Sequence, residues 1–132
     1  MTDALYPVQA EGALALPGDP AAITLPSGQV ATLQDVVWNA PGPAGLTLRF
    51  RFIAPAIAAE GGSVDFMTAS QDMAWLCQTY ALPRVPATGP QPQQIIISLA
   101  DRELAFGQPA PEATQFFEAY SLKDGLCILE AF

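Results

Sequence analysis

The stretch of sequence that decides the fold is Leu46-Thr47-Leu48-Arg49-Phe50-Arg51-Phe52. Its apolar side chains alternate with threonine and arginine, and a period of two residues places the two kinds on opposite faces of a β-strand. Residues 94–100 (QIIISLA) are apolar in both alternating sets, which is typical of a central strand covered on both faces. A sheet with a buried face is therefore expected at the centre of the fold.

Further strands are expected on both sides of this pair, because apolar runs there are separated by turn residues. Two pairs of runs predict hairpins, since a short connection containing glycine joins each pair. The connections are Pro26-Ser27-Gly28 and Lys123-Asp124-Gly125. The additional strands are expected at residues 23–25, 29–38, 64–66 and 114–122, at residues 126–132, and in a short run after Asp101-Arg102 that ends at Phe106.

One segment has the pattern of a helix. Thr68-Ala69-Ser70-Gln71 matches a capping box, in which the threonine hydroxyl accepts from the Gln71 amide, so a helix is expected to begin near Thr68. Pro83 is expected to end it near Leu82. The apolar stripe of this helix consists of Met73, Leu76, Cys77 and Tyr80.

These elements predict an α+β fold, an antiparallel sheet of about five to seven strands with one main helix packed on one face. Residues 1–22 show no sustained period and include Pro7, Pro17 and Pro20, so we interpret them as an extended N-terminal arm. Residues 23–132 are then expected to form a single α+β domain.

Composition excludes several classes of function. The 132 residues include no histidine, which rules out Ser-His-Asp and Cys-His catalysis and histidine metal ligands. Five basic residues against 13 acidic ones give a net charge of −8, which disfavours nucleic-acid binding. No run approaches the roughly 18 apolar residues of a membrane span. We predict no catalytic residue, no cofactor and no metal site from motifs in this chain.

Six segments of the chain carry a resemblance: Val36-Val37-Trp38-Asn39, Gly45-Leu46-Thr47-Leu48-Arg49-Phe50-Arg51-Phe52, Asp72-Met73 with Leu76-Cys77, Thr88-Gly89-Pro90-Gln91-Pro92, Ile97-Ser98-Leu99-Ala100-Asp101-Arg102 and Gln115-Phe116-Phe117-Glu118-Ala119-Tyr120. Over about residues 25–132 they resemble an uncharacterised family of small alphaproteobacterial proteins. Some members have been labelled acetolactate synthase, a large thiamine-diphosphate enzyme, but this chain has neither its length nor its cofactor motif. The resemblance therefore implies no activity.

The resemblance does imply a location. Members of the family begin with a secretory leader, so we expect a periplasmic mature protein. The cytoplasm is the alternative, because Met1-Thr2-Asp3-Ala4-Leu5 lacks the positive and apolar segments of such a leader.

The two cysteines, Cys77 and Cys127, are too far apart in sequence for a CxxC redox or zinc motif. In a cytoplasmic protein they are expected to be buried thiols, and in an exported protein they are expected to form a disulfide. The export that the resemblance implies favours the disulfide.

Candidate contacts with a partner or ligand come from three places. Arg49 and Arg51 share the polar face of one strand, where they can clamp an anion or pair with acidic residues of the same chain. The proline-rich loop around Gly89 and Pro90 is either a preordered binding segment or a simple connection. The remaining candidates are the charged residues beside strands, Asp101, Arg102 and Glu118.

Carboxylate catalysis is the competing interpretation of the acidic residues. Asp101, Glu103, Glu118 and Glu130 lie on or beside strands, where a pair of carboxylates can serve as acid and base, although solvated strand faces give the same pattern. Our first hypothesis is a non-enzymatic exported domain that binds a protein partner or supports an envelope assembly. The alternative is a small carboxylate-based enzyme or a protein that binds a small ligand.

Overall fold

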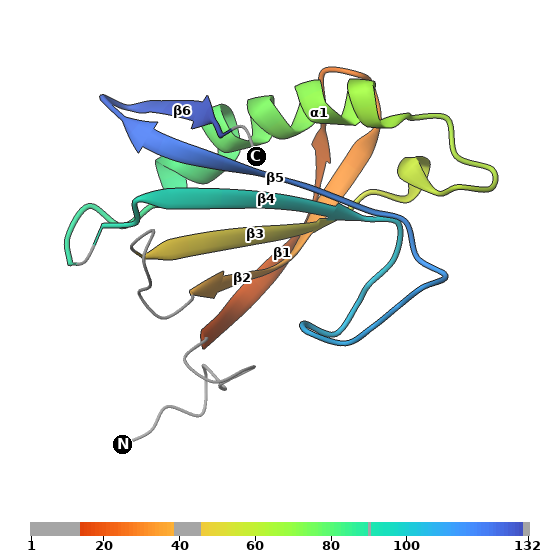
Figure 1. Cartoon of the computed structure of the whole chain (residues 1–132), viewed down its shortest axis with the longest axis horizontal. Coiled ribbons are helices and arrows are strands. Elements are labelled where there is room, and N and C mark those ends of the chain that lie inside the picture. Colours follow the sequence, from red (N-terminus) through yellow and green to blue (C-terminus); the bar gives the residue numbers. More distant parts are fainter. Residues whose placement is uncertain (1–13, 39–45, 90, 131–132) are drawn as a thin grey trace.

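The computed structural model describes residues 14–38, 46–89 and 91–130. Six strands form one sheet in chain order, and Figure 1 shows them side by side beneath a helical segment. The strands are β1 (Leu14–Thr24), β2 (Val30–Trp38), β3 (Thr47–Ile53), β4 (Gln94–Ala100), β5 (Gln115–Lys123) and β6 (Leu126–Leu129). The α+β prediction is confirmed.

The sheet is antiparallel except at its centre, where β3 and β4 are parallel. In the chain, the helical segment lies between β3 and β4. It returns the chain from the end of β3 to the side of the sheet at which β3 begins, so that β4 can run parallel to β3. Such a crossover is what a parallel pair requires. The expectation of a purely antiparallel sheet is therefore corrected at this one pair.

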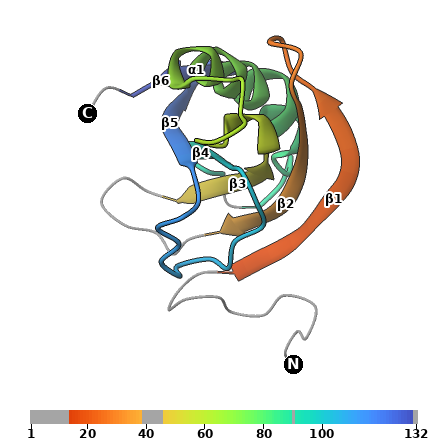
Figure 2. The same ribbon diagram turned by 90° about the vertical axis from the view of Figure 1, so that its right-hand side faces the viewer.

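Helix α1 (Phe66–Trp75) continues through a wider π-helical turn, Leu76–Ala81, and ends in a 3-10 turn, Leu82–Arg84. The predicted stripe is buried: Met73, Leu76 and Cys77 are fully covered and Tyr80 is 9% exposed. Figure 2 shows the helical segment on the concave side of a strongly curved sheet. Its apolar stripe packs there against inward side chains of β3, β4 and β5, namely Leu48, Phe50, Phe52, Ile95, Ile97, Leu99 and Tyr120.

The start of the helix differs from the prediction. Asp65 is the N-cap, and its carboxylate accepts a hydrogen bond from the Thr68 backbone N–H at 2.9 Å. The capping box at Thr68 is therefore wrong: the helix begins at Phe66, and its capping carboxylate accepts from the Thr68 N–H rather than from the Gln71 N–H of the predicted box. The short strand expected at residues 64–66 is also wrong, since Phe66 is already helical.

Strand β1 was missed over most of its length. We expected a strand only from Ile23, but β1 begins at Leu14, so the expected boundary after residue 22 falls inside a strand. Because prolines disfavour strands, the sequence of this segment does not have the pattern of a strand. An edge strand tolerates proline, since one side of its backbone pairs with no neighbouring strand. Gly18 is needed here, because a Cβ at this position would collide with the carbonyl oxygens of Leu33 and Gln34.

The C-terminal hairpin is confirmed between β5 and β6. Asp124 and Gly125 connect the strands with φ of 53° and 76°, the left-handed conformation of a two-residue turn. Cys127 is bonded to Cys77 with an S–S distance of 2.15 Å, which confirms the disulfide. Gln78 adds two hydrogen bonds to this end, accepting from the Cys127 N–H at 2.9 Å and donating to the Gly125 carbonyl at 3.0 Å. The hairpin is thereby tied to the helical segment.

Candidate functional site

Arg49 and Arg51 lie on the convex face of β3, opposite the helical segment, as their alternation with buried residues predicted. Arg51 faces Asp35 across the β2–β3 register and forms an ion pair with it at 3.0 Å. Burial raises the pKa of the Asp35 carboxyl, and the charge and hydrogen bond of Arg51 offset this only in part. Arg51 also donates to the Leu104 carbonyl.

The segment of residues 101–114 folds back beneath the sheet and covers this face (Figures 1 and 2). It contains no strand, so the short strand expected to end at Phe106 is wrong. The amide of Gln34 holds the segment in place, donating to the Leu104 carbonyl at 2.6 Å and accepting from the Leu104 N–H at 3.2 Å. These contacts occupy the backbone N–H and carbonyl of Leu104, which a strand would have paired.

A pocket of about 250 Å³ lies between the segment and the sheet. The Phe106 ring stands beside both arginines, with its centroid 5.9 Å from the Arg49 guanidinium and 5.2 Å from that of Arg51. The pocket is lined by Arg49, Arg51, Ser98, Gln115 and residues 104–108. We call it the arginine pocket.

The other charged candidates lie elsewhere. Asp101 pairs with Arg102 at 2.9 Å, and this hydrogen bond lowers the pKa of Asp101. Glu118 is on the concave face of β5, where it accepts from the Ser70 hydroxyl of α1 at 2.7 Å. Asp101 and Glu118 thus bind different partners in different parts of the fold.

The proline-rich loop is closed by its own side chains. Gln91 donates to the carbonyls of Pro86 and Gly89 at 2.9 and 3.2 Å, so two backbone acceptors of the loop are occupied within the loop itself. Gly89 has a φ of 84°, which suits glycine. Pro90 lies outside the described residues.

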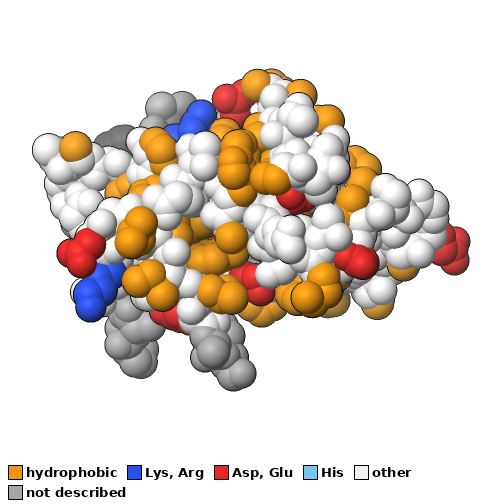
Figure 3. Space-filling model, turned by 90° about the horizontal axis from the view of Figure 1, so that it is seen from above, with side chains coloured by type: hydrophobic (Ala, Val, Ile, Leu, Met, Phe, Trp, Pro, Cys, Tyr) orange, Lys and Arg blue, Asp and Glu red, His pale blue; other side chains and the backbone are white. Residues whose placement is uncertain are grey.

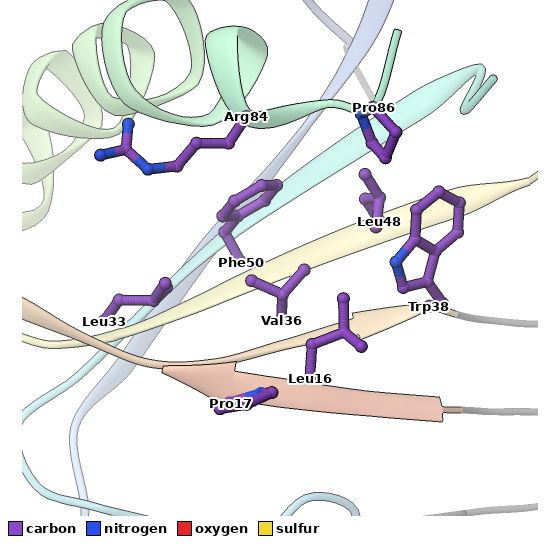
Figure 4. A pocket seen from close by; sticks show the side chains of 9 residues that line it. All are labelled: Leu16, Pro17, Leu33, Val36, Trp38, Leu48, Phe50, Arg84 and Pro86. Atoms are coloured by element: carbon purple, nitrogen blue, oxygen red, sulfur yellow. The ribbon is translucent and has the colours of Figure 1, made fainter. Parts of the chain in front are cut away.

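Sequence reasoning missed an apolar cleft on the concave face. It measures about 210 Å³ and lies between strands β1 to β3 and the start of the proline-rich loop. In Figure 4 Leu16, Val36 and Leu48 rise from the strands below Pro86, which closes the cleft from the opposite wall, while Arg84 lies along its rim. The lining residues are Leu16, Pro17, Leu33, Val36, Trp38, Leu48, Phe50, Arg84 and Pro86.

Arg84 is the charged residue in this lining, and two contacts with Tyr80 fix its position. It donates to the Tyr80 carbonyl at 2.9 Å, and its guanidinium lies 3.5 Å from the centre of the Tyr80 ring. A guanidinium stacked on an aromatic ring keeps its orientation and still offers donors at its edge. The signal that could have located the cleft was Arg84 and Pro86 directly after the helix, opposite the apolar positions of residues 46–52.

A second apolar surface follows β6. Leu126, Ile128 and Leu129 are 55%, 43% and 54% exposed. Figure 3 shows hydrophobic side chains gathered along this edge of the molecule. Because the disulfide and Gln78 hold β6 against the helical segment, this edge is anchored rather than open along its whole length.

None of the helices in residues 14–38, 46–89 and 91–130 has both the length and the apolar character needed to cross a membrane. Within the same residues, His, Cys, Asp and Glu side chains do not gather in groups of three that could hold a metal ion.

Comparison with known proteins identifies one family. The model of a family described as "Family of unknown function (DUF6497)" matches residues 6–132, nearly the whole chain. No curated protein and no solved structure matches the chain. The resemblance seen in the sequence is therefore confirmed at the level of a family of unknown function.

Proposed function

Because the chain belongs to a family of unknown function, DUF6497, we propose its role from its own surfaces. It is a non-enzymatic domain of an oxidising, extracytoplasmic compartment that binds a protein partner through the apolar cleft. The Cys77–Cys127 disulfide supports the compartment, because such bonds form and persist outside the reducing cytoplasm.

The apolar cleft is the observation on which this proposal rests. Its volume of about 210 Å³ and its mostly apolar lining suit one large apolar side chain. Protein interfaces commonly depend on such an anchor, buried in a preformed apolar pocket. Burying one large apolar side chain there contributes about 1.5–3 kcal/mol to binding before the costs of association.

The charge of Arg84 indicates which kind of residue the partner carries beside its apolar anchor. Its guanidinium, fixed by the contacts with Tyr80, lies at the rim of a cleft whose other lining residues are uncharged. The chain as a whole has a net charge of −8. A carboxylate placed beside the apolar anchor of the partner would meet this guanidinium. The expected partner segment is therefore a large apolar residue next to an acidic one.

The enzyme alternative has less support. The sequence has no histidine. Of the four carboxylates that we considered for acid–base catalysis, Asp101, Glu118 and Glu130 are bound by Arg102, Ser70 and Gln94 respectively, and the fourth is Glu103. A glycosidase-type mechanism needs two carboxyl groups facing one bond, within about 10 Å of each other. None of these four carboxylates lines the cleft.

Site-specific photo-crosslinking in the native host tests the proposal. A benzophenone side chain at Pro86, the exposed residue that closes the cleft, should capture a protein that the same group at Glu60 does not capture. The captured protein is then purified and its affinity measured with the wild type, with Leu16→Arg, which places a charge in the cleft, and with Leu126→Arg, a matched control on β6.

We expect Leu16→Arg to weaken binding by about 100-fold, the equivalent of 2–3 kcal/mol, and Leu126→Arg to leave it unchanged. Equal binding by the wild type and Leu16→Arg would refute the cleft as the docking site. Circular dichroism of the variants checks that both remain folded.

A further inference from the structure

On the convex face of β3, the positive charge of Arg49 has no acidic partner among the described residues. Arg49 and Arg51 are two positions apart on one strand, so their side chains leave the same face about 7 Å apart. One carboxylate, Asp35, faces this pair, and it is bound to Arg51. The Arg49 side chain forms no hydrogen bond or ion pair with any residue in the described part of the chain.

Arg49 is nonetheless largely buried. Its Nε is covered and has no acceptor, and burial together with the nearby charge of Arg51 lowers its pKa. Leaving a buried charge without a partner is costly, and proteins rarely keep one without an ion or ligand to compensate. The chain has 13 acidic residues, and none of those in the described part is placed against Arg49.

Aromatic rings frame the guanidinium. The centroids of Phe106 and Phe117 each lie 5.9 Å from it, one supplied by the covering segment and the other by β5. Both rings lie within the distance of a cation–π contact, which favours the charged guanidinium and leaves its N–H groups free to donate. Ser98 and Gln115 add neutral hydrogen-bonding groups to the lining of the same pocket.

We propose that the arginine pocket binds a small carboxylic acid through a bidentate ion pair with Arg49. A carboxylate matches the two parallel N–H donors of a guanidinium, and its charge balances that of the buried arginine. The volume of about 250 Å³ limits the ligand to a few carbon atoms beyond the carboxylate. This site lies on the face of the sheet opposite the apolar cleft, so it does not depend on the proposed partner.

Titration of ¹⁵N-labelled protein with acetate, propionate and benzoate at constant ionic strength tests the site. The Nε–H resonance of Arg49 should shift saturably with at least one of these acids, with the dissociation constant in the millimolar range or below. Sodium chloride and phosphate are titrated in parallel. A response equal to that of chloride for all three acids would overturn the proposal, and tighter binding of phosphate would overturn the choice of carboxylate.

Three variants separate a ligand site from a structural role. Arg49→Met should abolish the saturable shifts of the pocket amides, and Arg49→Lys should weaken binding about tenfold by removing the paired donors. Arg102→Met removes an equal charge from an exposed ion pair and should leave affinity unchanged.

Thermal melting provides the second readout. Without ligand, Arg49→Met should melt at the same temperature as the wild type or higher, because it removes an unpaired buried charge. A lower melting temperature for Arg49→Met, combined with unchanged affinity for the acids in Arg49→Lys, would show that Arg49 only supports the fold. Leu16→Arg should bind the acids normally, which distinguishes failure here from failure of the cleft.

Discussion

Replacing Asp72 with alanine should destabilise the fold through the turn between β1 and β2. Asp72 is on α1, is fully buried, and accepts hydrogen bonds from the Ser27 N–H at 3.0 Å, from the Ser27 hydroxyl, and from the Gln29 amide at 2.8 Å. These bonds join the first hairpin to the helix across more than 40 positions of sequence. No comparable contact between that turn and α1 is present among the described residues.

The magnitude follows from what the substitution leaves behind. Ser27 is exposed, so water can replace its lost hydrogen bonds at little cost. Gln29 is 7% exposed and its Oε1 already lacks a partner, so losing Asp72 also leaves its amide nitrogen buried without an acceptor. One buried unsatisfied group costs about 1–3 kcal/mol, and with the small void left by the carboxylate we expect a total loss of about 2–4 kcal/mol.

Urea denaturation followed by circular dichroism measures this loss, with Glu60→Ala as a control that removes the same charge from an exposed position. A double-mutant cycle with Gln29→Ala should show a coupling of about 1 kcal/mol or more, because the two residues share one hydrogen bond. The reasoning is refuted if Asp72→Ala costs no more than Glu60→Ala, or if the effects of Asp72→Ala and Gln29→Ala simply add.

Three further predictions concern stability. Replacing Cys77 and Cys127 together by alanine should lower the free energy of unfolding by about 4 kcal/mol, since the bond closes a loop across 50 positions; two free thiols in unfolded, unreduced wild-type protein would contradict the bond. Asp65→Ala should lower the melting temperature more than Thr68→Ala, because the Asp65 carboxylate accepts the terminal N–H; equal effects would count against this cap. A chain that starts at Ala21 lacks most of β1 and should melt at least about 5 °C lower or become insoluble; an unchanged melting curve would show that β1 adds little to the fold.

The predictions that succeeded rest on local patterns. The alternation in residues 46–52, the doubly apolar run at residues 94–100 and the helical stripe through Met73 and Tyr80 each appear within one element. A period of two or 3.6 residues is a property of consecutive side chains, so the sequence alone identifies such elements and their buried faces. The α+β class follows from combining them.

The errors occurred where the local signal was weak or ambiguous. Strand β1 carries prolines and a glycine, which disfavour a strand in isolation, and pairing along β2 outweighs that preference. The capping pattern at Thr68 led us to place the helix start there, whereas Asp65 caps the helix in the structure, and helix ends are uncertain by one or two residues when judged from sequence.

The sequence by itself determined that the chain lacks histidine chemistry, that it carries one helix on a sheet, and that Arg49 and Arg51 share a face. Only the tertiary structure determined which segment of the chain packs against that face. The covering segment is held by a contact between Gln34 and Leu104, 70 positions apart, and the apolar cleft joins β1 to residues after the helix. Such contacts depend on the path of the whole chain, and no periodicity within a single segment encodes them.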